Sequence, residues 1–315
     1  MENAPTQKNE ASRHRVYGLT VESWIPFPEL PEAAPRAEVD IVFRRGQVPG
    51  ELEAFRQTSK CYQAAIGRLL VRYEGIARYL VTGGREIVVE PAEGVLESDV
   101  RLYLLCSPMG ALLLQRGLLP LHASAISTPR GAVLFMGKSG AGKSTLAAEY
   151  RRRGFRVLTD DLSVISFSEE GFPWVSPGFP QFKLRPDVID ALGERSDNLP
   201  RSSPNFDKAT MAFPDEFEST PMPVACIYLV QPSAGAEAEI QSVGPLVRIS
   251  DLLEHTYRLN FVKGLGLQQS HFRQVARLAA RVRLTRVLRP HDKFRIEKLA
   301  DLITGDFDQC AASFA

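Results

Sequence analysis

Residues 137–145 constrain this chain more than any other segment. They read Gly-Lys-Ser-Gly-Ala-Gly-Lys-Ser-Thr and match the phosphate-binding pattern G-x-x-x-x-G-K-[S/T] in full. An apolar, β-prone run at 132–136 precedes them, and a helix-forming run at 145–150 follows. Glycines allow successive backbone N–H groups to turn toward phosphate oxygens, and the positive end of the next helix dipole faces the same anion. The sequence therefore predicts a strand, a loop and a helix that together bind a nucleoside triphosphate.

Two side chains of this loop have separate expected roles. Lys143 is expected to reach the β- and γ-phosphates, and the Ser144 hydroxyl is expected to bind Mg²⁺. The pattern does not predict what happens to the γ-phosphate. The residues expected to contact the nucleotide are Gly137, Lys138, Ser139, Gly140, Ala141, Gly142, Lys143, Ser144 and Thr145.

Composition and charge narrow the class of protein. The 315 residues, 44% of them hydrophobic, suffice for one large domain or two medium ones. A net charge of +1 gives no electrostatic reason to expect nucleic acid or a membrane as a partner. The four cysteines are scattered without a C-x-x-C pair, which favours reduced thiols over a zinc site or disulfides. The first residues lack an apolar signal-peptide core, and the apolar region 102–121 is interrupted by Pro108, Gly110 and Arg116. We expect a soluble, cytoplasmic protein, and a homo-oligomer is compatible with the sequence.

Two parts are expected after a disordered tail at residues 1–13. Residues 14–117 read as a small, mainly antiparallel β domain, because short apolar runs alternate with glycine turns. The expected strands of this domain are 16–21, 39–43, 69–73, 77–81 and 86–90. A helix is expected from an N-cap at Ser98 to about Arg116.

Residues 118–315 are expected to form an α/β domain in which strand, loop, helix and strand follow one another in βαβ order. Further expected strands are 162–167, 174–176 and 224–230, a polar loop covers about 194–215, and expected helices are 249–261, 270–280 and 296–303. Residues 281–289 alternate basic and apolar side chains, which favours a half-buried edge strand over a nucleic-acid site.

A pair of aspartates is the second signal of a nucleotide site. The apolar run 154–159 ends in Asp160 and Asp161, shortly after the helix of the phosphate-binding loop. A carboxylate at the end of a neighbouring strand is suited to holding Mg²⁺. Because side chains alternate along a strand, the two carboxylates are expected to point differently, one to the metal and one to the acceptor. A solvated Asp-Asp turn is the alternative.

His122 is the third signal. A single histidine in an apolar strand is usually structural, but its spacing favours function. His122 lies 15 residues before Gly137, and Asp160 lies 23 residues after it. Histidine, glycine-rich loop and aspartate pair at these intervals resemble the catalytic domain of HPr kinase/phosphorylase and, more distantly, ATP-dependent phosphoenolpyruvate carboxykinase. The resemblance covers about residues 118–235.

This resemblance implies a P-loop kinase domain of the α/β class, ATP and Mg²⁺ as cofactors, and a role for each signal residue. Asp160 would help to hold Mg²⁺, Asp161 would take the proton of an acceptor serine, and His122 would lie beside the phosphates. One segment departs from the family. Residues 180–186 read Pro-Gln-Phe-Lys-Leu-Arg-Pro, where that family has a glutamate near the metal.

A second resemblance extends over nearly the whole chain. Segments at 17–19, 25–30, 121–124, 180–184 and 255–258, with Ser23, are similar to HPr kinase-related proteins of peptide-maturation gene clusters. Some of these phosphorylate the C-terminal serine of a lasso peptide precursor. The implied function is therefore an ATP-dependent serine kinase acting on a precursor peptide. Alternatives are a kinase/phosphorylase of a small carrier protein, a small-molecule kinase, and a switch that binds ATP without phosphorylating a partner.

Four basic residues are candidates for binding the acceptor: Lys183, Arg185, Lys208 and Arg258. Each is able to neutralise phosphate charge or to bind a peptide carboxylate. Surface solvation or a structural salt bridge is the alternative for each.

Overall fold

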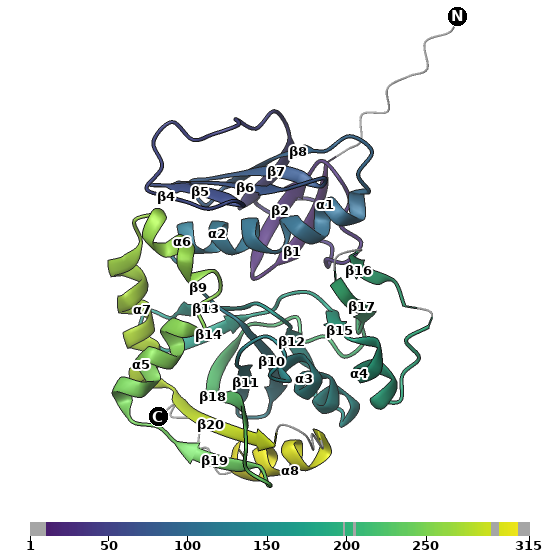
Figure 1. Ribbon diagram of the computed structural model, residues 1–315, viewed down its shortest axis with the longest axis vertical. Coiled ribbons are helices and arrows are strands. Elements are labelled where there is room, and N and C mark those ends of the chain that lie inside the picture. Colours follow the sequence, from purple (N-terminus) through teal and green to yellow (C-terminus); the bar gives the residue numbers. More distant parts are fainter. Residues whose placement is uncertain (1–10, 198, 204–205, 291–295, 308–315) are drawn as a thin grey trace, which may run out of the picture.

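The structure, a computed structural model, describes residues 11–197, 199–203, 206–290 and 296–307. The described residues form a mixed α/β molecule with three β-sheets (Figure 1). An eight-stranded sheet lies at one end of the molecule and a nine-stranded sheet at the other. A three-stranded sheet lies beside the nine-stranded one. In this described part of the chain, each helix is too short or too polar to cross a lipid bilayer.

The eight-stranded sheet is built from the first 91 residues. Its strands are β1 Ser12–Val16, β2 Leu19–Ser23, β3 Ile41–Arg45, β4 Gln57–Thr58, β5 Tyr62–Ala65, β6 Arg68–Tyr73, β7 Ala77–Thr82 and β8 Glu86–Pro91. They pair in the order β1-β2-β3-β8-β7-β6-β5-β4, and only the β2–β3 and β3–β8 pairings are parallel.

Two details at the start of this sheet differ from the sequence-based expectation. The predicted single strand 16–21 is wrong, because a hairpin turns there. Tyr17 and Gly18 have φ values of 53° and 76°, and a two-residue hairpin of the I′ type needs positive φ at both positions. β1 begins at Ser12, inside the expected tail, and residues 1–10 lie outside the described residues.

Helices α1 Glu97–Leu104 and α2 Ser107–Gln115 lie between the two large sheets (Figure 1). The prediction of one helix over this region is wrong. Pro108 has no backbone N–H and is tolerated only in the first turn of a helix, so a new helix starts beside it. Every residue of α2 from Ser107 to Leu114 is buried, which places this helix inside the molecule.

The nine-stranded sheet holds the glycine-rich loop. Its strands are β9 Leu119–Leu121, β10 Ala123–Thr128, β11 Gly131–Met136, β12 Val157–Thr159, β13 Ser163–Phe167, β14 Pro173–Ser176, β18 Met222–Ser233, β19 Glu239–Ser242 and β20 Arg283–Pro290. β11, β18 and β20 are parallel neighbours. Helix α3 Lys143–Arg152 follows β11, and β12 returns on the other side of β10. β20 pairs with both β18 and β19, so the prediction of an edge strand at 281–289 is wrong.

The remaining elements flank this sheet. They are β15 Gln181–Leu184, α4 Pro186–Ala191, β16 Arg201–Ser203, β17 Phe206–Ala212, α5 Pro245–Glu254, α6 Leu259–Gly264, α7 Gln268–Arg281 and α8 Ile296–Phe307. The predicted polar loop at 194–215 contains β16 and β17, because Ala209 and Met211 alternate into the core between polar neighbours. The predicted helix 249–261 is two helices, separated at 255–258, where Arg258 has a φ of 56°.

One hydrophobic core joins the first 117 residues to the rest. Tyr62 of β5 packs against Phe261 of α6 with ring centroids 4.8 Å apart. Leu162 and Val164 belong to the same buried cluster as Tyr79 and the residues of α2. The eight-stranded sheet and the nine-stranded sheet therefore enclose a common interior, and the candidate site described next lies where the two meet.

Candidate active site

The glycine-rich loop runs from the end of β11 to the start of α3. Gly137, Gly140 and Gly142 have φ values of 153°, 81° and 103°, which side chains rarely allow. A Cβ at Gly137 would lie 2.5 Å from the carbonyl oxygen of Val230 in β18. The loop therefore lies directly against the neighbouring strand, and glycine is required there by sterics.

Lys143, the first residue of α3, is buried under this loop. Its Nζ donates to the carbonyl oxygens of Gly137 at 2.9 Å and Lys138 at 3.1 Å, and contacts His122 Nε2 at 3.1 Å. Burial lowers the pKa of Lys143, and the negative charges of Asp161 and Asp160 oppose that effect. The ammonium group is thus held inside the loop that the sequence predicts to bind phosphates.

Arg289 of β20 is hydrogen-bonded to the same loop, a role that the sequence does not indicate. Its guanidinium donates from Nε to the Ala141 carbonyl at 2.9 Å and from Nη2 to the Gly140 carbonyl at 3.2 Å. The residue is 9% exposed, and burial lowers its pKa. A charged donor on these two carbonyls fixes the direction of the intervening peptide groups, and hence of the N–H groups on the opposite side of the loop.

The two aspartates follow β12 and occupy a tight turn. The Leu162 N–H donates to the Asp160 carbonyl at 2.8 Å, and Asp161 between them has a φ of 68°. A hydrogen bond between residues two apart around a positive φ is the pattern of a γ-turn, which is strained and uncommon. The two carboxylates do point differently, as expected, but the turn causes this and strand alternation does not.

Asp160 points inward and is held by Ser124. Ser124 Oγ donates to its Oδ1 at 2.6 Å. Burial raises the pKa of Asp160, and the hydroxyls of Ser124 and Ser144 oppose that effect. The two residues expected to bind the metal, Asp160 and Ser144, are therefore close enough for the Ser144 hydroxyl to affect the pKa of Asp160.

This donor set fits Mg²⁺. Among the described residues, no group of three or more His, Cys, Asp or Glu side chains could hold a metal ion. Mg²⁺ needs few protein ligands beside a nucleotide, since phosphate oxygens and water complete its octahedron. One carboxylate from Asp160 and one hydroxyl from Ser144 meet that requirement.

Asp161 points outward and is held by His122. The His122 Nδ1 lies 3.2 Å from Asp161 Oδ1 and 2.9 Å from the Asp161 carbonyl oxygen. Because Nε2 faces the Lys143 ammonium, Nδ1 carries the proton and donates to Asp161. Burial alone would raise the pKa of Asp161, but the His122 hydrogen bond and the charges of Lys183 and Lys208 hold it well below its usual range. Asp161 is thus an ionised acceptor at the end of a chain that begins at Lys143.

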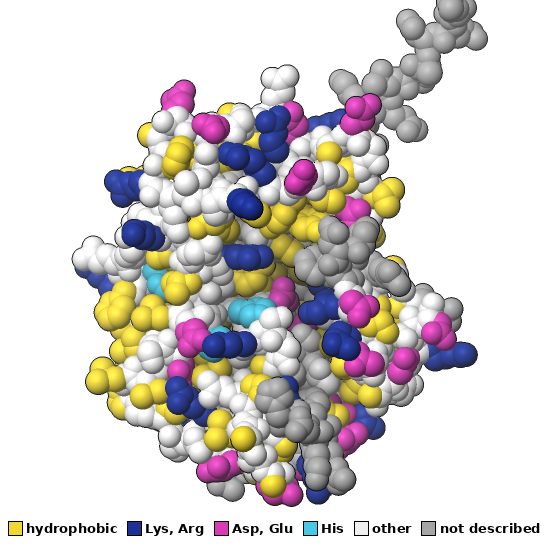
Figure 2. All heavy atoms as spheres, in the orientation of Figure 1, with side chains coloured by type: hydrophobic (Ala, Val, Ile, Leu, Met, Phe, Trp, Pro, Cys, Tyr) yellow, Lys and Arg dark blue, Asp and Glu magenta, His cyan; other side chains and the backbone are white. Residues whose placement is uncertain are grey.

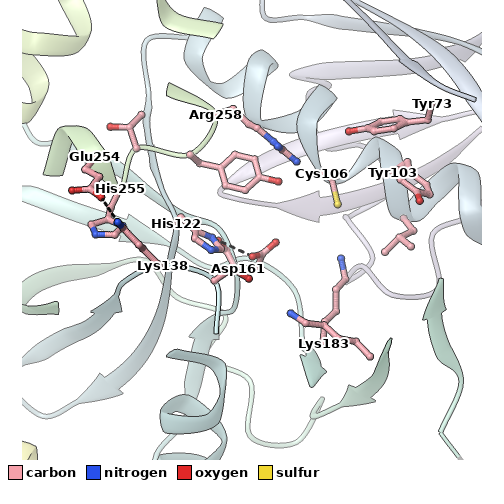
Figure 3. Close-up of a pocket in the computed structure, with 15 residues that line it drawn as sticks. Tyr73, Tyr103, Cys106, His122, Lys138, Asp161, Lys183, Glu254, His255 and Arg258 are labelled. Atoms are coloured by element: carbon pink, nitrogen blue, oxygen red, sulfur yellow. Dashed lines mark hydrogen bonds and ion pairs between the residues drawn. The ribbon is translucent and has the colours of Figure 1, made fainter. Parts of the chain in front are cut away.

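The chain Lys143–His122–Asp161 opens into a cavity of about 610 Å³. Figure 2 shows histidine, basic and acidic side chains gathered around this hollow between the two large sheets, with hydrophobic side chains behind them. The lining residues come from both parts of the molecule: Tyr73, Leu102, Tyr103, Cys106, His122, Lys138, Ser139, Asp161, Lys183, Lys208, Glu254, His255, Thr256, Tyr257 and Arg258. Figure 3 shows Asp161 and His122 on one side of the cavity and Tyr73 and Tyr103 on the other.

Three of the four predicted acceptor-binding cations line this cavity, namely Lys183, Lys208 and Arg258. Burial alone would lower the pKa of Lys183, but neighbouring ionisable groups, among them Asp161, raise it. Arg185 does not line the cavity. It precedes α4, where its Nε is paired with Asp187 Oδ1 at 2.9 Å and both side chains are exposed. Arg185 therefore forms a surface salt bridge, which is the structural alternative given above for this residue.

The segment that carries Arg258 is fastened to the strand before His122. The His122 N–H donates to the His255 carbonyl at 2.8 Å, and the Tyr257 N–H donates to the Pro120 carbonyl at 2.9 Å. Arg258 Cζ lies 5.4 Å from the centre of the Tyr257 ring, within range of a cation–π contact. These bonds give Arg258 a fixed position relative to His122.

Comparisons with known proteins add little to this picture. No family model matches the sequence, and no curated protein does either. One solved structure that matches is the Hpr(Ser) kinase/phosphatase from Coxiella burnetii, at 12% sequence identity and a TM-score of 0.31. The match covers 59% of this chain and 89% of that one. A likeness of this size carries no argument about activity, and the site is interpreted from its own geometry.

Proposed function

We propose that this chain is an ATP-dependent kinase that phosphorylates the C-terminal serine of a ribosomal precursor peptide of the lasso type. The observation that carries the proposal is the chain Lys143–His122–Asp161, which connects the glycine-rich loop to an ionised carboxylate facing a 610 Å³ cavity. A protein that only binds the nucleotide as a switch needs one carboxylate for the metal, here Asp160. It does not need a second carboxylate that is fixed by a histidine, as Asp161 is. Asp161 therefore favours transfer over binding alone.

In the proposed reaction the serine Oγ forms a bond to the γ-phosphorus, and the bond from that phosphorus to the β–γ bridging oxygen breaks. The serine proton passes to the Asp161 carboxylate, and ADP is the leaving group. Mg²⁺, held by Asp160 and Ser144 when bound, supplies positive charge beside the phosphates. Lys143 exchanges its loop carbonyls for phosphate oxygens and stabilises the charge that develops on them.

The low pKa of Asp161 suits this chemistry. Phosphoryl transfer passes through a loose transition state in most analyses, so the acceptor hydroxyl needs orientation more than early deprotonation. An ionised carboxylate orients a hydroxyl by accepting its hydrogen bond. His122 keeps the Asp161 carboxylate ionised and fixed in direction.

The positive side chains in the cavity are the reason to propose the C-terminus of a peptide as the acceptor. Lys183, Lys208 and Arg258 line it together with Asp161 and Glu254, and Glu254 already pairs with Lys138 at 3.1 Å. A serine at the end of a peptide brings its own carboxylate next to the reacting hydroxyl. Charge-assisted hydrogen bonds to such a carboxylate contribute about 1.5–3 kcal/mol each.

Three matched peptides test this proposal. One ends in serine as the free acid, one ends in serine amide, and one carries the serine one residue inward. Mass spectrometry after incubation with Mg·ATP should show at least about tenfold faster phosphorylation of the free acid, since one charged contact is lost in the others. Arg258→Ala should reduce this preference, whereas Arg185→Ala, the same change outside the cavity, should not.

The outcomes separate the alternatives. Equal phosphorylation of all three peptides would remove the terminal-serine assignment and favour a folded carrier protein that presents an internal serine. Tight Mg·ATP binding without transfer to any peptide or carrier protein would favour the non-catalytic switch.

A further inference from the structure

One wall of the cavity, across from Asp161, is apolar and aromatic. It is formed by Tyr73 of β6 and by Leu102 and Tyr103 of α1 (Figure 3). The Tyr73 and Tyr103 ring centroids lie 4.4 Å apart at an interplanar angle of 45°. The Tyr73 hydroxyl donates to Ser107 Oγ at 2.6 Å, so its polar end already has a partner in the protein. We call these three residues the tyrosine wall.

Arg258 lines the same cavity as the tyrosine wall and Asp161. The His122 ring, which holds Asp161, has its centroid 6.1 Å from that of Tyr257. The Arg258 guanidinium lies over the Tyr257 ring, 5.4 Å from its centroid, and points toward Cys106 and Tyr73 (Figure 3). The cavity therefore offers one ligand the Asp161 carboxylate, the Arg258 cation and an aromatic wall.

These three groups limit where the next residue of an acceptor peptide lies. With the serine hydroxyl at Asp161 and its α-carboxylate at Arg258, the preceding residue starts one Cα step of about 3.8 Å away. A cavity of about 610 Å³ has room for more than one residue. The Arg258 charge acts on the Tyr73 hydroxyl and opposes the rise of its pKa that burial causes, so the tyrosine wall lies beside the guanidinium and within reach of that second side chain.

We infer that the tyrosine wall is a specificity subsite for an aromatic or branched aliphatic side chain in the residue that precedes the phosphorylated serine. The inference rests on the proposed function, and it names a feature of the acceptor that the terminal carboxylate does not. Among the described residues of this wall no side chain is charged. A carboxylate buried there would lose water without gaining a partner of its own, and would compete with the terminal carboxylate for Arg258.

The test uses free-acid peptides that differ only in the residue before the terminal serine, namely Leu, Phe, Ala or Asp. The kcat/KM for the Leu and Phe peptides should exceed that for the Ala peptide by about tenfold or more, since filling an apolar pocket discriminates by that order. The Asp peptide should be the poorest substrate.

Two variants with the same change show whether the tyrosine wall is responsible. Leu102→Arg places a cation in the subsite, so it should reduce kcat/KM for the Leu peptide by about tenfold and reverse the order of the Leu and Asp peptides. Leu96→Arg makes the same change just before α1, at a residue that is 67% exposed and outside the cavity, and should leave the order unchanged. If Leu102→Arg does not fold, Leu102→Ala should shift the preference from Leu toward Phe by enlarging the subsite.

Each failure has its own meaning. Equal kcat/KM for the four free acids, with the terminal amide still a poor substrate, would overturn the subsite and leave the terminal-serine kinase standing. Absence of phosphorylation for all four peptides would overturn the proposed function and the subsite with it. An unchanged peptide order in a folded Leu102 variant would remove the tyrosine wall as the cause of any selectivity.

Discussion

Replacing Arg289 by methionine is expected to weaken nucleotide binding indirectly, through the conformation of the glycine-rich loop. Methionine keeps an apolar stem of similar length in β20 but removes the donors to the Gly140 and Ala141 carbonyls. These two bonds connect β20 directly to the glycine-rich loop. Without them the loop peptides are free to rotate, and its N–H groups no longer converge on one anion site.

The magnitude follows from the two bonds. A hydrogen bond with one charged partner contributes about 1.5–3 kcal/mol, which sets an upper limit near 6 kcal/mol for the pair. Arg289 is 9% exposed, so water enters after the substitution and satisfies the two carbonyls in part. We therefore expect about 2–3 kcal/mol to be lost from nucleotide binding, which raises Kd by about 30- to 150-fold.

Calorimetric titration with Mg·ATP measures this Kd directly, and thermal unfolding shows whether the variant is folded. Arg286→Met is the matched control. It makes the same change on the same strand, where Arg286 pairs with Asp251 of α5 at 2.7 Å and not with the loop. A Kd within about twofold of the wild-type value in folded Arg289→Met would refute the reasoning. An equal loss in Arg286→Met would show that the strand, not the contact, matters.

Further expected outcomes concern the residues around the phosphates. Lys143→Ala should abolish phosphoryl transfer in a radiolabel assay, and normal turnover by the folded variant would contradict its role. Asp160→Asn should weaken Mg·ATP binding, whereas Asp161→Asn should keep it and slow transfer by about 10²–10⁴-fold; equal loss of binding in both would remove the division of roles. Because burial raises the pKa of Asp160, Mg·ATP binding should weaken on acidification at a pH above the ordinary aspartate pKa of about 3.9. Ser124→Ala removes a hydrogen bond that opposes this rise in pKa, so the loss of Mg·ATP binding on acidification should begin at a higher pH. If the pH at which binding is lost does not change, Asp160 is not the group that causes the loss. A phosphohistidine trapped at His122 would overturn its role as the residue that orients Asp161.

The parts of the site that are local in sequence could be predicted from it. The glycine-rich loop is recognisable because its strand, loop and helix follow one another directly in the sequence. At Gly137 any side chain would collide with the neighbouring strand, so only glycine fits. The aspartate pair and His122 are candidates because their spacing around the loop resembles that of a known family, and the structure brings His122 and Asp161 together. The γ-turn at Asp161 could not, because aspartate gives no local signal for a positive φ there.

The parts that depend on distant strands could not be predicted. Arg289 reads as one more basic residue in an alternating run, and only the position of β20 beside β18 brings it under the loop. Tyr73 reads as a strand residue near a hairpin, and only the packing of α1 and α2 beneath the first sheet turns it toward the cavity. Both roles depend on pairings that no short segment encodes.

The common interior of the two large sheets also limits how segments of this chain can be exchanged with those of related proteins. A Cβ at Gly110 of α2 would lie 2.7 Å from the Tyr257 ring, and a Cβ at Gly264 of α6 would lie 2.4 Å from Ala64 Cβ. Each of these two close contacts lies between a residue before position 117 and a residue beyond position 250. A chimaera cut near residue 117 would set unmatched surfaces against each other at both points. The segments that meet at these two points, β5 and α2 before position 117 and residues 257–264 beyond position 250, therefore move intact to a new scaffold only when they are grafted together.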